Sequence, residues 1–223
     1  ELFKLREKKG MTLEKARKLL ERDCLYFGAM LVRMGYAVGM VAGSNSPTAD
    51  VLRSAIHVVG TKPGLKTVSS SMIMITKTPE YGENGVLIYG DCGVIPKPTP
   101  EQLADIAICS AEKARSIAGI AEPRVAMLSF STFGSADSED VTRVQQAVSI
   151  LKERNVDFKF AGELQFDAAL VPAVSEKKAP NSEIKGRANV LIFPDLGAGN
   201  IGYKITERLA KAEALGPLIQ GLA

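Results

Sequence analysis

Short apolar runs alternate with helix-like stretches along most of this chain of 223 residues. The apolar runs have the length and composition of strands, and they occupy residues 36–43, 65–75, 84–94, 123–132, 157–160 and 189–193. Strands that alternate with helices are typical of α/β proteins, in which each helix carries the chain back to the start of a parallel strand. We therefore expect an α/β fold with a largely parallel sheet.

Local signals mark where several helices and one turn should form. Thr12 and Thr99 are suitable helix caps, and Pro100 follows Thr99 at the first helical position. Asn84 and Gly85 favour a tight hairpin turn, so the strands on either side should pair antiparallel and make the sheet mixed. Helices are predicted at residues 12–22, 24–34, 48–59, 98–117, 138–152, 164–171 and 205–215.

Composition and charge argue against several classes of protein. The formal net charge of +3 and the absence of a Lys/Arg block speak against nucleic acid as a partner, and the apolar runs are too short to cross a membrane. Three widely spaced cysteines fit a reduced, cytoplasmic protein better than a disulfide framework. The single histidine, His57, makes a multi-histidine metal site untenable, so no metal is expected. His57 is interpreted as a packed or surface residue, and Cys92 as a structural one.

Gly197, Gly199 and Gly202 spell G-x-G-x-x-G directly after the apolar run at residues 189–193. A dinucleotide site of this kind also needs an acidic residue about 20 positions further on, at the end of the next strand. Residues 215–223 contain neither an acid nor a clear strand signal. The motif is interpreted as a glycine turn that packs a helix on a strand, or as a small-molecule site that uses backbone amides. Dinucleotide binding is the weakest of these hypotheses.

Small hydroxyl residues follow two of the predicted strands. Ser46 and Thr48 stand where a strand ends and a helix begins, and Ser131 and Thr132 stand at the end of another strand. Free backbone amides and the helix dipole favour an anion at such a position, although plain helix capping explains the first pair equally well. Two such strand ends in one sheet predict a cleft along its carboxyl edge.

Four long segments together resemble phosphate acetyltransferases: residues 48–74 (TADVLRSAIHVVGTKPGLKTVSSSMIM), 127–136 (MLSFSTFGSA), 162–170 (GELQFDAAL) and 193–223. The resemblance covers nearly the whole chain in the family's order. It implies transfer of an acetyl group between acetyl phosphate and coenzyme A by direct thiolate attack in a ternary complex. Coenzyme A is then a substrate, and no tightly bound cofactor is expected. The resemblance also implies a homodimer of the two-domain isocitrate/isopropylmalate dehydrogenase-like fold, with largely parallel mixed sheets and a cleft between domains.

The resemblance assigns substrate-binding roles to several residues. Arg6 and Arg53 match arginines that help bind the anionic substrates, and Gly199 and Asn200 match part of the wall around the active cleft. Hydroxyls for the phosphate or acetyl oxygen are expected from the strand-end residues Ser46, Thr48, Ser131 and Thr132. This last assignment rests on their positions in the chain more than on the family.

The resemblance also divides the chain. Residues 1–70 correspond to part of the first domain, residues 71–219 to the second, and residues 220–223 to the start of a return to the first. The chain is interpreted as a fragment, with the family's Ser-Arg motif and its Asp, the expected base, beyond Ala223. The catalytic residues are therefore unknown, and the fragment alone is expected to have little or no activity.

Two other functions share these motifs. A phosphate butyryltransferase would differ mainly in pocket size, although residues 90–104 (GDCGVIPKPTPEQLA) resemble the acetyl branch. A malic enzyme can carry a phosphotransacetylase-like tail that serves regulation and assembly. The sequence determines neither the acyl preference nor the direction of the reaction, and it reveals no allosteric effector.

Overall fold

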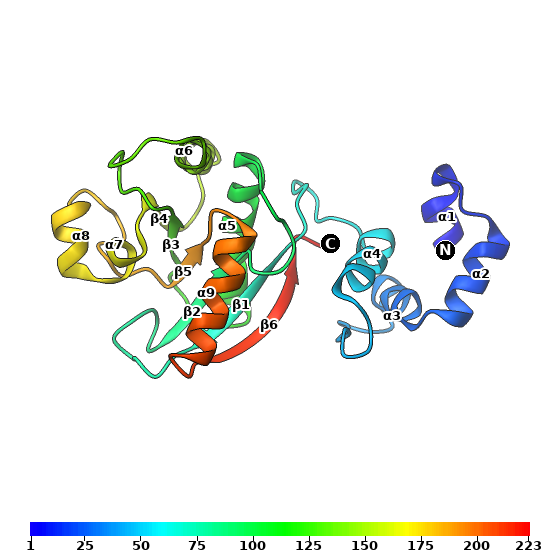
Figure 1. Ribbon diagram of the computed structural model, residues 1–223. Coiled ribbons are helices and arrows are strands. Elements are labelled where there is room, and N and C mark those ends of the chain that lie inside the picture. The colour runs from blue at the N-terminus through cyan, green and yellow to red at the C-terminus, as the bar shows by residue number, and fades with distance from the viewer. The chain divides into compact units, whose positions relative to one another are not determined.

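The computed structural model describes residues 1–223 and divides them into two compact units. Unit 1 comprises Glu1–Leu65 with Leu222–Ala223, and unit 2 comprises Lys66–Gly221. Figure 1 shows the labelled elements of both units. None of the helices combines the length and the apolar character that a membrane span requires.

Unit 1 is helical. Its elements are α1 (Leu2–Arg6), the 3-10 helix η1 (Glu7–Lys9), α2 (Leu13–Arg22), α3 (Cys24–Arg33) and α4 (Thr48–Val58). Thr12 accepts a hydrogen bond from the N–H of Lys15, which confirms the predicted cap of α2. The helices pack around a small core whose buried members are Leu2, Ala16, Tyr26, Ala29, Met30 and Val58.

The strand predicted at residues 36–43 is wrong. The segment forms neither strand nor helix, and Tyr36, Val38 and Val41 are 74%, 110% and 103% exposed. An apolar segment becomes a strand only beside another strand that takes up its backbone hydrogen bonds. Unit 1 contains no strand that could do so.

Unit 2 is built on one six-stranded sheet with the order β4-β3-β5-β2-β1-β6. The strands are β1 (Ser69–Ile75), β2 (Val86–Gly90), β3 (Arg124–Leu128), β4 (Lys159–Leu164), β5 (Val190–Ile192) and β6 (Glu213–Gln220). The pairs β2–β5, β3–β4 and β3–β5 are parallel, whereas β1 runs antiparallel to β2 and β6. This sheet confirms the predicted α/β class with a mixed, largely parallel sheet. Asn84 and Gly85, both with positive φ, form the expected hairpin turn.

Helices cover both faces of the sheet in unit 2 (Figure 1). They are α5 (Pro100–Ser116), α6 (Glu139–Glu153), α7 (Phe166–Leu170), α8 (Pro172–Lys178) and α9 (Leu196–Arg208). Successive residues of a strand point to opposite faces, so β1 gives Ile73 to the core under α5 and α6, and Met72 and Met74 to the opposite core. The carboxyl ends of the parallel strands lie at one edge of this three-layer arrangement.

Two predictions near the carboxyl end are wrong. The helix expected at residues 205–215 instead spans Leu196–Arg208. It begins at Leu196 because the side chain of Asp195 accepts a hydrogen bond from Ala198 N–H and caps the helix there. Residues 213–220, where no strand is expected, form β6 at the edge of the sheet, paired with β1 alone. Gly216 and Pro217 interrupt the strand pattern there, and a sheet edge tolerates both.

Candidate functional site

The two arginines assigned to substrate binding, Arg6 and Arg53, both act electrostatically on one hydrogen-bonded pair in unit 1. Tyr26 Oη and His57 Nδ1 are 2.6 Å apart. Arg6 from α1 and Arg53 from α4 both lie close enough to shift the pKa of each member of the pair. The helices of unit 1 therefore gather two guanidinium groups that stand far apart in the sequence.

Positive charge dominates around His57. Burial lowers the pKa of its imidazole, and the charges of Arg6, Arg53 and Lys9 lower it further. Burial also raises the pKa of Tyr26. Both side chains are neutral at neutral pH as a result, and the surrounding cations favour an anion at this point.

The spacing of residues along α4 brings the charged side chains together. Asp50, Arg53 and His57 are three and four residues apart, which places them on one face of the helix. Arg53 Nη1 and Asp50 Oδ1 form an exposed ion pair at 2.5 Å. Such a pair contributes little to stability, so Arg53 is free to turn to a more strongly charged anion.

Ser46 and Thr48 lie at the amino end of α4. Pro47 occupies the cap position, and no side chain caps the helix. Thr48 is the first helical residue and is exposed, whereas Ser46 is half-buried. Plain capping therefore does not account for these hydroxyls, and their role toward an anion stays a prediction.

Ser131 and Thr132 lie in unit 2, in the loop after β3, and both are buried. Ser131 Oγ donates to Glu163 Oε1 at 2.8 Å, and the N–H of Gly134 donates to the same oxygen. Thr132 Oγ1 accepts a hydrogen bond from Gln165 N–H at 3.0 Å. Both hydroxyls hold the loop to the end of β4, so a ligand would have to compete with these bonds. Their assignment to substrate stays a prediction.

Gly199 and Asn200 fix α9 against the loop that follows β2. A Cβ at Gly199 would collide with the backbone oxygen of Asp91, so only glycine allows this approach. Asn200 Nδ2 donates to the backbone oxygen of Cys92 at 3.1 Å. Gly199, the second glycine of the G-x-G-x-x-G motif, thus allows α9 to pack closely against this loop. Helix packing therefore accounts for a glycine at this position without a bound dinucleotide.

A buried carboxylate organises the same loop. Asp91 Oδ1 accepts hydrogen bonds from Ser70 Oγ and from the N–H groups of Gly93 and Val94, and Oδ2 accepts one from Ile95 N–H. Burial raises the pKa of the neighbouring Cys92 thiol, and the charge of Asp91 raises it further. Cys92 is therefore a protonated, buried thiol. This confirms its structural interpretation and makes it unsuitable as a nucleophile.

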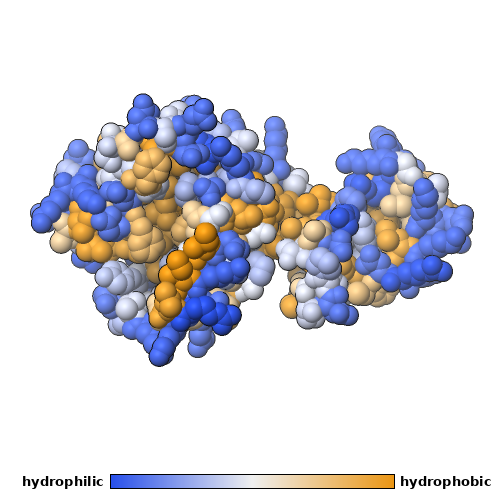
Figure 2. Space-filling view, viewed as in Figure 1, coloured by the Kyte–Doolittle hydropathy of each residue, from blue (hydrophilic) through white to orange (hydrophobic).

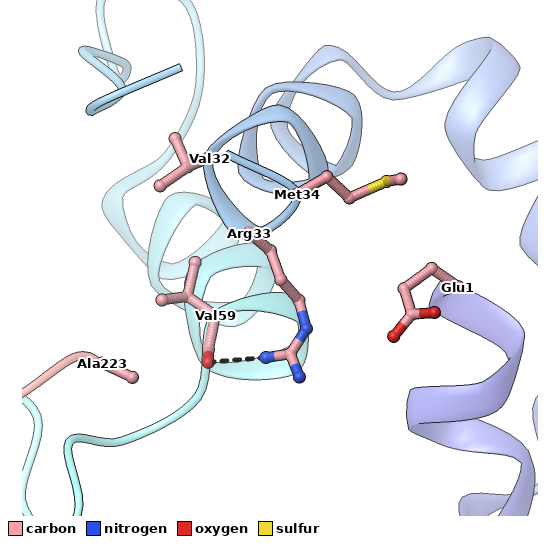
Figure 3. A pocket seen from close by; sticks show the side chains of 6 residues that line it. All are labelled: Glu1, Val32, Arg33, Met34, Val59 and Ala223. Atoms are coloured by element: carbon pink, nitrogen blue, oxygen red, sulfur yellow. Dashed lines mark hydrogen bonds between the residues drawn. The ribbon is translucent and has the colours of Figure 1, made fainter. Parts of the chain in front are cut away.

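Open pockets lie apart from the predicted residues. One in unit 1, of about 490 Å³, is lined by Glu1, Val32, Arg33, Met34, Val59 and Ala223 (Figure 3). Arg33 Nη1 donates to the backbone oxygens of Val58 and Val59, so this cation is used to cap α4.

A pocket in unit 2, of about 650 Å³, is lined by Lys97, Pro100, Asp137, Ser138, Glu139, Thr142, Arg143 and Gln146. No predicted site residue lines either pocket, and no group of three or more His, Cys, Asp and Glu side chains is placed to hold a metal.

Three residues near the proposed anion site, His57, Tyr26 and Lys9, are not among the substrate-binding residues predicted from the sequence. His57 is half-buried and bonded to Tyr26, in agreement with its interpretation as a packed or surface residue, and its spacing of four positions from Arg53 is that of neighbours on a helix face. Tyr26 and Lys9 carry no such signal. Their proximity depends on how α1, η1 and α3 pack against α4, which no local pattern reveals.

The whole chain, residues 1–223, matches the family model described as phosphate acetyl/butaryl transferase. A phosphate acetyltransferase of Thermoanaerobacterium thermosaccharolyticum is 54% identical over 222 residues, which cover 100% of this chain and 67% of the relative. The phosphate acetyltransferase of Bacillus subtilis is 50% identical over 220 residues, which cover 99% of this chain and 65% of the relative.

Solved structures of phosphotransacetylases are also similar to this chain. A phosphotransacetylase from Streptococcus pyogenes superposes with a TM-score of 0.89 at 44% identity, over 97% of this chain and 64% of that one. The EutD phosphotransacetylase from Staphylococcus aureus superposes with a TM-score of 0.85 at 46% identity, over 99% of this chain and 65% of that one. The chain thus spans about two thirds of the length of the proteins it matches.

Proposed function

Because the chain belongs to the phosphate acetyl/butaryl transferase family, we propose that the protein transfers an acetyl group between acetyl phosphate and coenzyme A. The observation that carries this proposal is the setting of the hydrogen-bonded Tyr26–His57 pair, with Arg53 one turn from His57 on α4 and the charge of Arg6 acting on both side chains. Both substrates are anions, and guanidinium groups are the side chains best suited to phosphate oxygens.

The protein needs mainly to position the two reactants. The coenzyme A thiol loses its proton, its sulfur attacks the carbonyl carbon of acetyl phosphate, and the bond from that carbon to the phosphate oxygen breaks. The electron pair leaves with the phosphate. Acetyl phosphate is already activated, so holding the two reactants in line supplies much of the rate. Arg6 and Arg53 would hold the phosphate and stabilise the charge that develops on it.

Other parts of the proposal rest on the resemblance. They are the two-domain dehydrogenase-like fold with its boundaries near residues 70 and 219, the use of coenzyme A as a substrate instead of a tightly bound cofactor, and a cytoplasmic location. Substrate contacts are also proposed for Ser46, Thr48, Ser131, Thr132, Gly199 and Asn200. A crystal structure of the protein with bound coenzyme A would test the fold and these contacts together.

A homodimer belongs to the same proposal, and α9 supports it. Figure 2 shows a row of hydrophobic residues along the exposed face of this helix. Ile201, Ile205 and Leu209 are spaced four residues apart and are 60%, 53% and 79% exposed. A two-fold axis would place this row against the same row of a second copy and bury both. The molar mass measured by light scattering tests the assembly.

The enzymatic proposal is tested in the full-length gene product that contains these residues. It should form acetyl-CoA from acetyl phosphate and coenzyme A. Arg53→Ala should raise the KM for acetyl phosphate about 10- to 100-fold, since losing a charged hydrogen-bonding group costs about 1.5–3 kcal/mol. Lys18→Ala is a matched control, because Lys18 forms only an exposed pair with Glu14.

Two outcomes decide the matter. A folded protein that turns over no acyl phosphate contradicts the proposal. Faster turnover of butyryl phosphate than of acetyl phosphate would shift the assignment to the butyryl enzyme, and the relatives named above lead us to expect the reverse.

A further inference from the structure

The hydrogen bond between Tyr26 and His57 indicates which imidazole nitrogen carries the proton. Tyr26 is 7% exposed, and its hydroxyl has no other hydrogen-bond partner in the structure. If His57 Nδ1 donated this bond, the hydroxyl hydrogen of Tyr26 would have no acceptor among the protein groups around it, which is unfavourable. Tyr26 Oη therefore donates to His57 Nδ1, and the neutral ring carries its proton on Nε2.

Charged groups from four elements surround this pair. They are Arg6 of α1, Lys9 of η1, Asp23 at the cap of α3, and Asp50 and Arg53 of α4. Asp23 Oδ1 accepts the N–H groups of Leu25 and Tyr26, and Asp50 is paired with Arg53. Burial and, after it, the cations lower the pKa of His57, so the ring offers a neutral N–H group to its surroundings.

That N–H group is unused. The side chain of His57 is half-buried, and no hydrogen bond in the structure involves its Nε2. His57 lies one turn from Arg53 on α4, so its N–H group is a donor near the place where an anion is expected, and a neutral donor adds a hydrogen bond without adding to the repulsion among the cations.

We propose that His57 is a third donor of the anion site, with its Nε2–H directed to the phosphate that Arg6 and Arg53 bind. Tyr26 is then a positioning residue, because its hydroxyl selects the tautomer that donates. The opposite tautomer would present a lone pair to the anion and repel it. This inference rests on the proposed function, since the phosphate is that of acetyl phosphate.

Two substitutions of His57 separate donation from packing. Glutamine places an amide N–H group near the position of Nε2, whereas asparagine reaches only the position of Nδ1. In the full-length protein, His57→Asn should raise the KM for acetyl phosphate about tenfold with little change in kcat. His57→Gln should raise it less than about threefold. Thermal unfolding of both variants, expected at similar midpoints, separates this effect from a loss of folding.

The tautomer is measured directly by ¹⁵N NMR of the imidazole, with the signals of His57 identified by their absence from the His57→Gln spectrum. The wild-type ring should be protonated at Nε2, and Tyr26→Phe should give a mixture of tautomers and a raised KM. A ring protonated at Nδ1 overturns the inference. Equal KM values for the Asn and Gln variants overturn it as well.

Arg53→Ala distinguishes this inference from the proposed function. If Arg53→Ala raises the KM for acetyl phosphate and His57→Asn does not, only the role of His57 is refuted. If neither substitution changes the KM, the anion site itself is refuted.

Discussion

In unit 2 the apolar strands lie between helices, and the buried carboxylates Asp91 and Glu163 accept hydrogen bonds from nearby backbone amides. In unit 1 an apolar segment around Val38 lies in solvent, and three cations gather around the neutral pair of Tyr26 and His57. Unit 2 pairs most of its buried polar groups internally, as a scaffold does, although five buried side-chain atoms, among them Arg143 Nε, have no hydrogen-bond partner. In unit 1 Asp50 pairs with Arg53, but Arg6 and Lys9 add positive charge around His57, and this is where an anionic ligand has something to contribute.

The largest effect should come from a change within the scaffold of unit 2. Asp91→Ala removes the acceptor of several buried donors and should destabilise the protein by about 3 kcal/mol or more. The midpoint of thermal unfolding should fall by about 6–12 °C. Asp137→Ala is the control, because Asp137 is exposed. Equal midpoints for the two variants would show that the loop does not depend on its carboxylate.

A smaller effect on the free energy of unfolding is expected from replacing one valine in each unit by alanine. Val125→Ala empties a fully buried position of β3 and should cost about 1–3 kcal/mol. Val38→Ala should cost less than about 0.5 kcal/mol, because Val38 is fully exposed. Urea unfolding of both variants measures the two costs. A cost for Val38→Ala close to that for Val125→Ala would mean that residues 36–43 are buried in solution, and the contrast between the units would not stand.

The smallest effect is the pH dependence contributed by His57. Its pKa is lowered in the folded protein from the ordinary value of 6.5, so the unfolded chain binds the proton more readily. The stability that this contributes is fully present above pH 6.5, and it is lost as the pH falls below 6.5 and through the lowered pKa of the folded protein. Urea midpoints at pH 7.5 and pH 5.5 should therefore differ more for the wild type than for His57→Gln. Identical pH dependence in both proteins would contradict the lowered pKa.

The sequence predicted the elements of unit 2 well where local signals determine them. Thr99 caps α5 as expected, and residues 76–85, which end in the tight turn at Asn84 and Gly85, connect the antiparallel strands β1 and β2. The predictions from the sequence are wrong where a strand depends on a partner far away in the chain. Residues 36–43 have the composition of a strand but no neighbour to pair with, and β6 is a strand only because β1 lies beside it.

The glycine-rich start of α9 was missed for a related reason. Three glycines in one helix are unfavourable for helix formation, so the pattern indicates a turn. Asp195 caps the helix there, and the close approach of Gly199 to Asp91 compensates through packing. Of the candidate site, the resemblance supplied Arg6 and Arg53, whereas the bond of His57 to Tyr26 depends on how α3 packs against α4.

The central claim is that Arg6 and Arg53 hold one anion, and a double-mutant cycle tests it most directly. The KM for acetyl phosphate would be measured for Arg6→Ala, Arg53→Ala and the double variant of the full-length protein. We expect each single change to raise the KM about 10- to 100-fold, and the double change to raise it by clearly less than the product of the two, because both arginines contact the same phosphate. Effects that multiply exactly, or a KM that neither change alters, would contradict the account.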